Sequence, residues 1–323
     1  MKNDELIPVV ISTDHSESVI LPRNIPIAII DPINNESIIN SLFTCDNFDD
    51  ELKLAKIFHD DRKAKFNITK STMPQIAEIG PLSATQRSQL DAIILSNNLS
   101  FTHDALDLGR VHCFKFRIEL RDPDKIAYVP PRILAPGIRE DANQEFLNWK
   151  KRGMVEESSS QFNSPLIVIK KGESKSTRLV IDSRQVNQNT KIEKTPIPHS
   201  QSILYNLGAK IKSESNFFLS RLDLSKAYNQ LPIYESDRGY SAFSFQGRSW
   251  QPTRVCYGFS AAPASWHRLM QNIFNGLPVE IFFDDIVWCT STFEEHLKIL
   301  NELLTRCIKF GLLIDEKKCH FCV

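Results

Sequence analysis

The sequence predicts an α+β fold in which hairpins of short strands are combined with amphipathic helices. Three observations predict it. Apolar runs flank an acidic pair within residues 279–289, and a polar loop joins two strand-like runs within residues 165–181. Residues 293–310 repeat apolar side chains at helical spacing. A chain of 323 residues is long enough for two or three domains with cores of their own.

Composition sets wide limits on function. Hydrophobic residues make up 41% and charged residues 24%, as in an ordinary globular protein, and the formal net charge is zero. The charge is uneven, because acidic residues are in excess in 1–70 and basic residues in 150–184. A neutral total can therefore hide a basic stripe able to contact phosphates.

The cysteines indicate the compartment. Seven are scattered along the chain, with no secretion signal before them and no apolar stretch near the ~20 residues of a membrane span. We therefore expect a reduced intracellular protein with free thiols. Cys319 and Cys322 have a CxxC spacing, but no second pair or histidine cluster completes a zinc site.

The first third of the chain carries weak signals. Residues 1–45 are rich in β-branched residues punctuated by prolines, which predicts a segment of short strands and turns. Residues 46–109 are interpreted as a connector that is charged and mobile over 46–75. This connector holds one short helix over 83–99, with Ser83 as its N-cap.

Alternation and helical spacing define the elements that follow. Residues 114–120 alternate apolar and polar side chains, which predicts a half-buried strand. Residues 139–151 predict a helix ended by Gly153, with Phe146, Leu147 and Met154 as its apolar positions.

Two further helices are expected near the end of the chain. One covers 259–275 and is entered through Ser260 and Pro263. The other covers 293–310; Thr292 and Glu295 can form its capping box, and Gly311 ends it.

Three aspartates are the candidate chemical groups. Asp284 and Asp285 form the tip of a predicted hairpin, and Asp223 ends another apolar run. Carboxylates beside such apolar strands are costly unless cations compensate them, and two divalent metals about 4 Å apart are what in-line phosphoryl transfer needs. This pattern favours a nucleic-acid polymerase. Strand alternation would aim only one residue of the adjacent pair at the metals. The alternatives are a solvated Asp-Asp turn and, for Asp223, a helix N-cap.

Longer motifs resemble successive motifs of reverse transcriptases, most of all those of gypsy-like long-terminal-repeat retrotransposons. The resemblance covers roughly residues 80–323. It runs through the segments 107–110, 153–155, 158–160, 163–168, 222–231, 257–264, 282–285, 295–297, 311–312 and 317–319. It implies a right-hand polymerase with fingers and palm, the palm built on an antiparallel sheet.

The resemblance also implies residue roles. Asp223, Asp284 and Asp285 would form the metal-binding catalytic triad for two Mg²⁺ ions, with Mn²⁺ as a substitute. Tyr228 looks like the aromatic gate that rejects a 2′-hydroxyl by a steric clash. Its other interpretation is a core tyrosine.

The remaining roles concern the incoming nucleotide. Lys171 and Arg178 flank the polar hairpin loop and would fold over the triphosphate, with Lys170 as an alternative to Lys171. The resemblance places Tyr257 and Gly258 at the substrate, where glycine would permit close approach. Lys318, or its neighbour Lys317, is similar to a lysine that protonates pyrophosphate; a solvated charge run is the alternative.

Some features depart from the family. Phe282 stands where a tyrosine precedes the acidic pair, and Phe283 is bulkier than the usual aliphatic residue. The chain stops at Val323, before the primer grip, thumb, connection, ribonuclease H and integrase that the resemblance leads us to expect.

The resulting hypothesis is a reverse transcriptase fragment over 110–323, in a retrotransposon polyprotein. The expected fingers are 110–195 and 232–257, and the expected palm is the intervening stretch and 258–323. It would transfer nucleotides from dNTPs to a primer 3′-hydroxyl on an RNA or DNA template. The expected partners also include the protease, ribonuclease H and integrase parts of the polyprotein, with no membrane. The expected location is a cytoplasmic virus-like particle, or the nucleus. The alternative is an inactive or domesticated remnant that binds nucleic acid or a protein.

Overall fold

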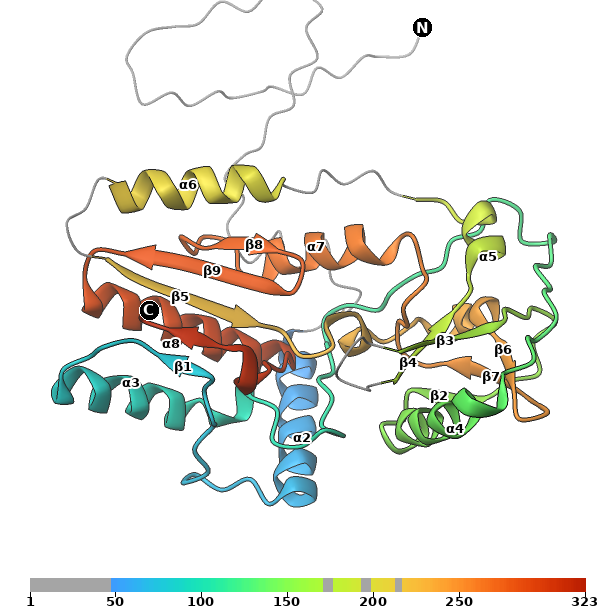
Figure 1. The fold of residues 1–323 in the computed structure, drawn as a ribbon, viewed down its shortest axis with the longest axis horizontal. Helices are drawn as coiled ribbons and strands as arrows, with labels where there is room; N and C mark the ends of the chain where they lie inside the picture. The colour runs from blue at the N-terminus through green and yellow to red at the C-terminus, as the bar shows by residue number, and fades with distance from the viewer. Residues whose placement is uncertain (1–47, 171–176, 193–198, 213–216) are drawn as a thin grey trace, which may run out of the picture. The chain divides into compact units, whose positions relative to one another are not determined.

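A five-stranded sheet is the largest sheet among the described residues. The computed structural model describes residues 48–170, 177–192, 199–212 and 217–323, which lie in one compact unit. In the sheet the strands β1 (Glu78–Ile79), β10 (His320–Phe321), β5 (Phe218–Asp223), β9 (Asp285–Thr290) and β8 (Glu280–Phe282) lie side by side in this order (Figure 1). Only β1 and β10 pair in parallel. The predicted α+β class with an antiparallel sheet is therefore confirmed.

Helices cover both faces of this sheet. On β9 the buried Trp288 stacks on His296 of helix α8 (Phe293–Phe310), with ring centroids 5.2 Å apart. Cys289, the next residue, packs with Ile203 and Leu207 of α6 (Ser200–Lys212). Because neighbouring strand residues point to opposite faces, α8 and α6 lie on opposite sides of β9 (Figure 1).

Helix α8 matches its sequence pattern closely. Its apolar stripe is buried, the Thr292 hydroxyl accepts a hydrogen bond from the Glu295 backbone N–H at 3.3 Å, and Gly311 ends the helix with φ 72°. The helix α3 (Ala84–Ser96) is also confirmed, with a complete capping box between Ser83 and Gln86.

Residues 46–75 differ from the expected mobile connector. Helix α2 (Phe48–Phe66) occupies most of this stretch and packs against α8. Its apolar side chains do not form a clear helical face in the sequence, and a buried arginine supplies several of its contacts. Arg62 donates to both carboxylate oxygens of Asp107 at 2.9 and 2.7 Å and to the carbonyl oxygens of Leu99 and Phe101. The interpretation of residues 46–75 as a mobile connector is therefore wrong for residues 48–66. The short strands predicted for residues 1–45 lie outside the described residues.

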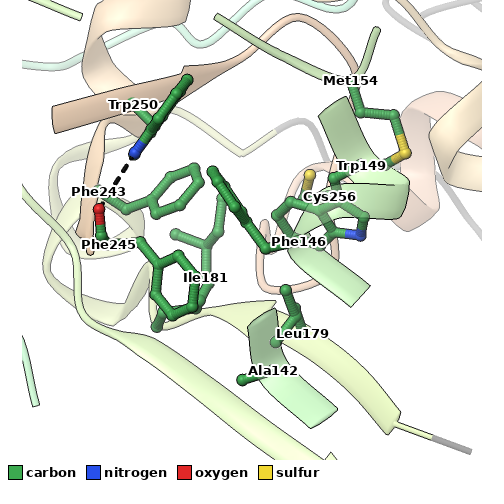
Figure 2. Packing of buried hydrophobic residues seen from close by; sticks show 11 residues of the cluster. Ala142, Phe146, Trp149, Met154, Leu179, Ile181, Phe243, Phe245, Trp250 and Cys256 are labelled. Carbon is green, nitrogen blue, oxygen red and sulfur yellow. Dashed lines mark hydrogen bonds between the residues drawn. The ribbon is translucent and has the colours of Figure 1, made fainter. Parts of the chain in front are cut away.

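A second group of elements surrounds its own core. Helix α4 (Pro136–Lys151) packs on the hairpin β3 (Leu166–Lys170) and β4 (Thr177–Ile181), and on the sheet β2 (Val155–Glu157), β7 (Arg248–Pro252) and β6 (Phe243–Phe245). Phe146 lies at the centre, with its ring centroid 4.8 Å from Phe245 and 5.1 Å from Trp250 (Figure 2). Trp149 completes this face and is buried, whereas the expected Leu147 is 46% exposed.

Two other predictions need adjustment. Residues 114–120 alternate in burial as expected, but they pair only through the isolated bridges Phe116 to Ile233 and Leu120 to Thr190 rather than as a strand. Helix α7 (Ala262–Ile273) carries Pro263 in its first turn, but Ser260 does not cap it. The hairpin β3–β4 is confirmed, and its loop 171–176 lies outside the described residues.

Smaller elements complete the chain. These are α5 (Arg184–Asn189) and the 3₁₀ helices η1 (Asn98–Ser100), η2 (Ala227–Gln230), η3 (Glu235–Ser241) and η4 (Glu316–Lys318). Within the described ranges, no helix combines the length and the apolarity that crossing a bilayer requires. Cys319 and Cys322, which have the CxxC spacing, are both buried free thiols.

Candidate active site

Three aspartates meet at one end of the central sheet. Asp223 is the last residue of β5 and pairs in register with Asp285, the first residue of β9. Asp284 precedes it in the turn between β8 and β9, and its backbone carbonyl accepts a hydrogen bond from the Leu224 N–H at 2.8 Å. Residues about sixty positions apart in the sequence are thus joined by strand pairing.

The turn that carries Asp284 is held in an uncommon conformation. Phe283 has φ 54°, in the left-handed region that costs a non-glycine residue free energy. The Trp266 indole N–H of α7 donates to the Phe283 carbonyl at 2.8 Å, and the Phe282 ring lies edge-on to the Phe283 ring at 4.8 Å. The hydrogen bond from Trp266 and the contact between the two phenylalanine rings stabilise the turn. Phe282 and Phe283, which depart from the usual motif, therefore pack against each other within it.

Cationic side chains compensate two of the three carboxylates. Lys318 donates to Asp223 at 2.9 Å. Arg221 donates from Nε to Asp285 at 2.9 Å. Arg221 and Asp223 are two residues apart on β5, so their side chains lie on the same face of the sheet. Asp285 pairs with Asp223 and therefore lies diagonally across from Arg221 on that face, which explains the ion pair between Arg221 and Asp285.

The electrostatics of the site follow from this crowding of charge. Burial raises the pKa of Asp223, Lys318 opposes that rise, and the neighbouring aspartates reinforce it. Burial is the largest single influence on Lys318 and would lower its pKa, but the hydrogen bond to Asp223 and the charges of Asp223, Asp315 and Asp284 together shift the pKa upward. The hydrogen bond to Asp285 raises the pKa of Arg221. All three shifts show negative charge gathered in a partly dehydrated site that stabilises cations.

The donor set suits a hard cation, although the carboxylates are not arranged around one. Carboxylate oxygens are the ligands that Mg²⁺ and Mn²⁺ prefer. Among the described residues, no group of three histidine, cysteine or acidic side chains is positioned to hold a metal ion, and Lys318 and Arg221 contact the oxygens instead. The residues present therefore fit the ion by chemistry and by charge, and a bound ion would compete with these two side chains.

Beside the aspartates lies a cavity of about 600 Å³. Asp284 of the β8–β9 turn, Lys318 of η4 (Glu316–Lys318), Arg178 of β4 and Tyr257 all line it. The Arg178 guanidinium carbon lies 4.4 Å from the centroid of the Tyr257 ring, a cation–π contact that orients the arginine. The structure thus brings Arg178 and the acidic tip to a single cavity.

Tyr228 lies under this region in η2. Its ring is edge-on to Tyr257 at 6.0 Å and to Trp266 at 6.2 Å, and burial raises its pKa to about 12. Next to burial, the charge of Asp284 is the main cause of this shift. The ring is therefore fixed near the acidic tip and half-buried, which agrees with a positioned aromatic side chain; its role as a gate stays a prediction.

The other predicted residues have separate outcomes. Lys171 lies outside the described residues, and its alternative Lys170 is paired with Asp141 of α4 at 2.9 Å. Gly258 has φ 123°, and a Cβ there would lie 2.1 Å from the Ile181 carbonyl oxygen. Glycine is thus required by the packing of the chain itself, and the predicted approach of substrate stays untested.

Sequence reasoning missed two residues of this region, Arg221 and Lys226. The spacing of Arg221 two residues before Asp223 on a strand was the available signal. Lys226 has φ 49° and donates to the Ala105 carbonyl at 2.8 Å, and nothing in its local sequence indicated this.

Comparisons with known proteins identify the family to which this chain is similar. Residues 169–323 match the family model described as "Reverse transcriptase (RNA-dependent DNA polymerase)". The Pol polyprotein from the Drosophila melanogaster transposon 412 is 34% identical over 243 residues, covering 73% of this chain and 19% of the relative. The corresponding protein of the Drosophila transposon gypsy is 28% identical over 193 residues, covering 57% and 18%. The chain thus spans about a fifth of the length of these relatives.

A solved structure shows the same fold. A foamy viral protease–reverse transcriptase, determined with an RNA/DNA hybrid, has a TM-score of 0.65 and 20% sequence identity. The match covers 83% of this chain and 33% of the viral one. With the family match over the acidic hairpin, these findings place the chain in the reverse transcriptase family, as the reverse transcriptase region of a retrotransposon Pol polyprotein.

Proposed function

We propose that this chain is the polymerase core of an RNA-directed DNA polymerase, which extends a DNA primer on an RNA or DNA template. The observation that carries the proposal is the in-register pairing of Asp223 with Asp285, which gathers three carboxylates beside a nucleotide-sized cavity. The family match over residues 169–323 supports the same reaction.

In this proposal Asp223, Asp284 and Asp285 would hold two Mg²⁺ ions. When bound, the ions polarise the α-phosphate, activate the primer 3′-hydroxyl and stabilise the pyrophosphate that leaves. Lys318 contacts Asp223 and Arg221 contacts Asp285, so a bound ion would compete with both of these side chains.

The other side chains position the nucleotide. Arg178 meets the triphosphate from the hairpin wall, since a guanidinium can bind phosphate through two N–H groups. Tyr228 supports the sugar and excludes a 2′-hydroxyl sterically. The ammonium group of Lys318, which donates a hydrogen bond to Asp223, supplies a proton to the departing pyrophosphate.

The proposed partners follow from the same chemistry. They are a template–primer duplex, dNTPs and the other parts of the polyprotein, within a cytoplasmic virus-like particle or the nucleus. The Pol relatives and the foamy viral enzyme solved with an RNA/DNA hybrid support this set.

The test is incorporation of a labelled dNTP on a primed homopolymer template, with Mg²⁺ and with Mn²⁺. The isosteric change Asp284→Asn is expected to abolish incorporation, because it removes a charge needed only by the ions and the transition state. Glu294→Gln, an equal charge change at an exposed position on α8, is the matched control and is expected to keep full activity.

The result also separates the polymerase from a nucleic-acid-binding remnant. A chain that retards template–primer on a gel but adds no nucleotide in either metal would identify the remnant. Equal incorporation by the wild type and by Asp284→Asn would remove the assignment of the active site.

A further inference from the structure

A pair of basic side chains lies in the same cavity, apart from the residues assigned above. Arg152 ends helix α4, and Lys226 lies between β5 and η2. Both line the cavity, and both donate to one acceptor, the Ala105 carbonyl oxygen, at 3.0 Å from the arginine and 2.8 Å from the lysine. One backbone oxygen thus brings two cations from distant segments together.

The charge of this pair is only partly compensated. The Arg152 side chain is 8% exposed, and its Nε is buried without a hydrogen-bond partner among the described residues. It forms an ion pair with Glu145 at 3.2 Å. A buried guanidinium N–H without an acceptor is costly, so an arrangement of this kind suits an anion that supplies oxygens.

Lys226 adds to this imbalance. Its backbone has φ 49°, in the left-handed region, which sets the direction of the Cα–Cβ bond. The pKa of Lys226 is lowered to about 8, first by burial and then by the charge of Arg152, while Glu145, Asp315 and Asp107 act in the opposite direction. A neighbouring anion would reverse that shift, because it favours the charged ammonium.

We propose that Arg152 and Lys226 form an anion subsite that binds the polyphosphate of the incoming nucleotide and of the pyrophosphate product. The inference rests on the proposed function and names a site within its cavity. A volume of about 600 Å³ suits a nucleotide, and Asp284 lines the same cavity as Arg152 and Lys226. Arg152 can grip a phosphate through paired N–H groups, and Lys226 adds a point charge. The pair is distinct from Arg178, which lies on β4.

The experiment measures binding of inorganic pyrophosphate to the full chain by calorimetry, without divalent metal. Arg152→Gln and Lys226→Gln are each expected to weaken binding about tenfold, the loss of one charge-assisted contact. Glu145→Gln is expected to tighten it, because it removes the carboxylate that competes for Arg152. Lys151→Gln, an equal charge change at the exposed neighbour, is expected to change nothing.

Several outcomes would overturn the subsite. These are no binding of pyrophosphate by the wild type, equal affinities of Lys226→Gln and wild type, or weaker binding by Glu145→Gln. Circular dichroism of each variant confirms its folding, and the tightening by Glu145→Gln cannot arise from misfolding.

Two further arms identify the ligand group. Binding of a dNTP should weaken in Lys226→Gln by the same factor as pyrophosphate, whereas binding of a deoxynucleoside monophosphate should not change. An equal loss for the monophosphate would overturn the assignment to terminal phosphates.

Proton uptake gives a readout that a structural role would not move. Near pH 8, pyrophosphate binding should draw a proton to Lys226, and the Lys226→Gln variant should take up less. Calorimetry in buffers of different ionisation enthalpy measures this difference, and equal uptake by both chains would contradict the proposal.

The subsite and the polymerase can fail independently. A chain that binds pyrophosphate through these residues yet incorporates no dNTP would retain the subsite and lose the polymerase. A chain that polymerises while Lys226→Gln changes neither pyrophosphate nor dNTP binding would retain the polymerase alone.

Discussion

The buried pair of Arg62 and Asp107 should anchor helix α2 to the rest of the fold. The two side chains are only 4% and 1% exposed, and Arg62 also donates to the carbonyl oxygens of Leu99 and Phe101. The change Arg62→Met keeps most of the volume and removes every one of these donors. Asp107 then keeps a single long contact, from the His103 backbone N–H at 3.2 Å.

The expected cost is large. Breaking a buried ion pair from one side costs about 3–5 kcal/mol, because the remaining charge is left uncompensated. We therefore expect Arg62→Met to lower the free energy of unfolding by about 3 kcal/mol or more. The double variant Arg62→Met/Asp107→Leu should recover much of the loss, since no buried charge then remains.

Urea unfolding followed by circular dichroism measures the global effect, and hydrogen exchange of the amides in residues 48–66 measures the local one. Lys63→Met, at the neighbouring exposed position, is the control and should leave the unfolding midpoint unchanged. A loss below about 1 kcal/mol in Arg62→Met, with unchanged exchange in α2, would refute the reasoning.

Three other predictions concern the site. Gly258→Ala should lower the melting temperature markedly, because the new Cβ would meet the Ile181 carbonyl oxygen and φ is 123°; an unchanged melting curve would contradict the packing argument. Tyr228→Ala should raise the ratio of ribonucleotide to deoxyribonucleotide incorporation in primer extension, and an unchanged ratio would remove its role as a gate. Arg221→Gln should free Asp285, which we expect to lower the Mg²⁺ concentration for half-maximal activity and to tighten Mn²⁺ binding measured by electron paramagnetic resonance without substrate. Unchanged Mn²⁺ affinity would show that Arg221 does not compete with metal.

The sequence by itself determined the elements whose signals are local. Helix α8 follows from the apolar stripe, the cap at Thr292 and the terminating Gly311, and the acidic hairpin follows from apolar runs around Asp284 and Asp285. These signals depend on residues a few positions apart, so a single sequence displays them.

Only the tertiary structure decided which distant groups meet. Strand register joined Asp223 to Asp285 and set Arg221 beside it, whereas a shift of one residue would have turned these side chains to the other face. Helix α2 escaped prediction because it lacks a clear apolar face and is held in part by the buried ion pair of Arg62 and Asp107, which are 45 positions apart. Likewise, Lys226 reaches Ala105 over a separation of 121 residues, and no local pattern encodes such a contact.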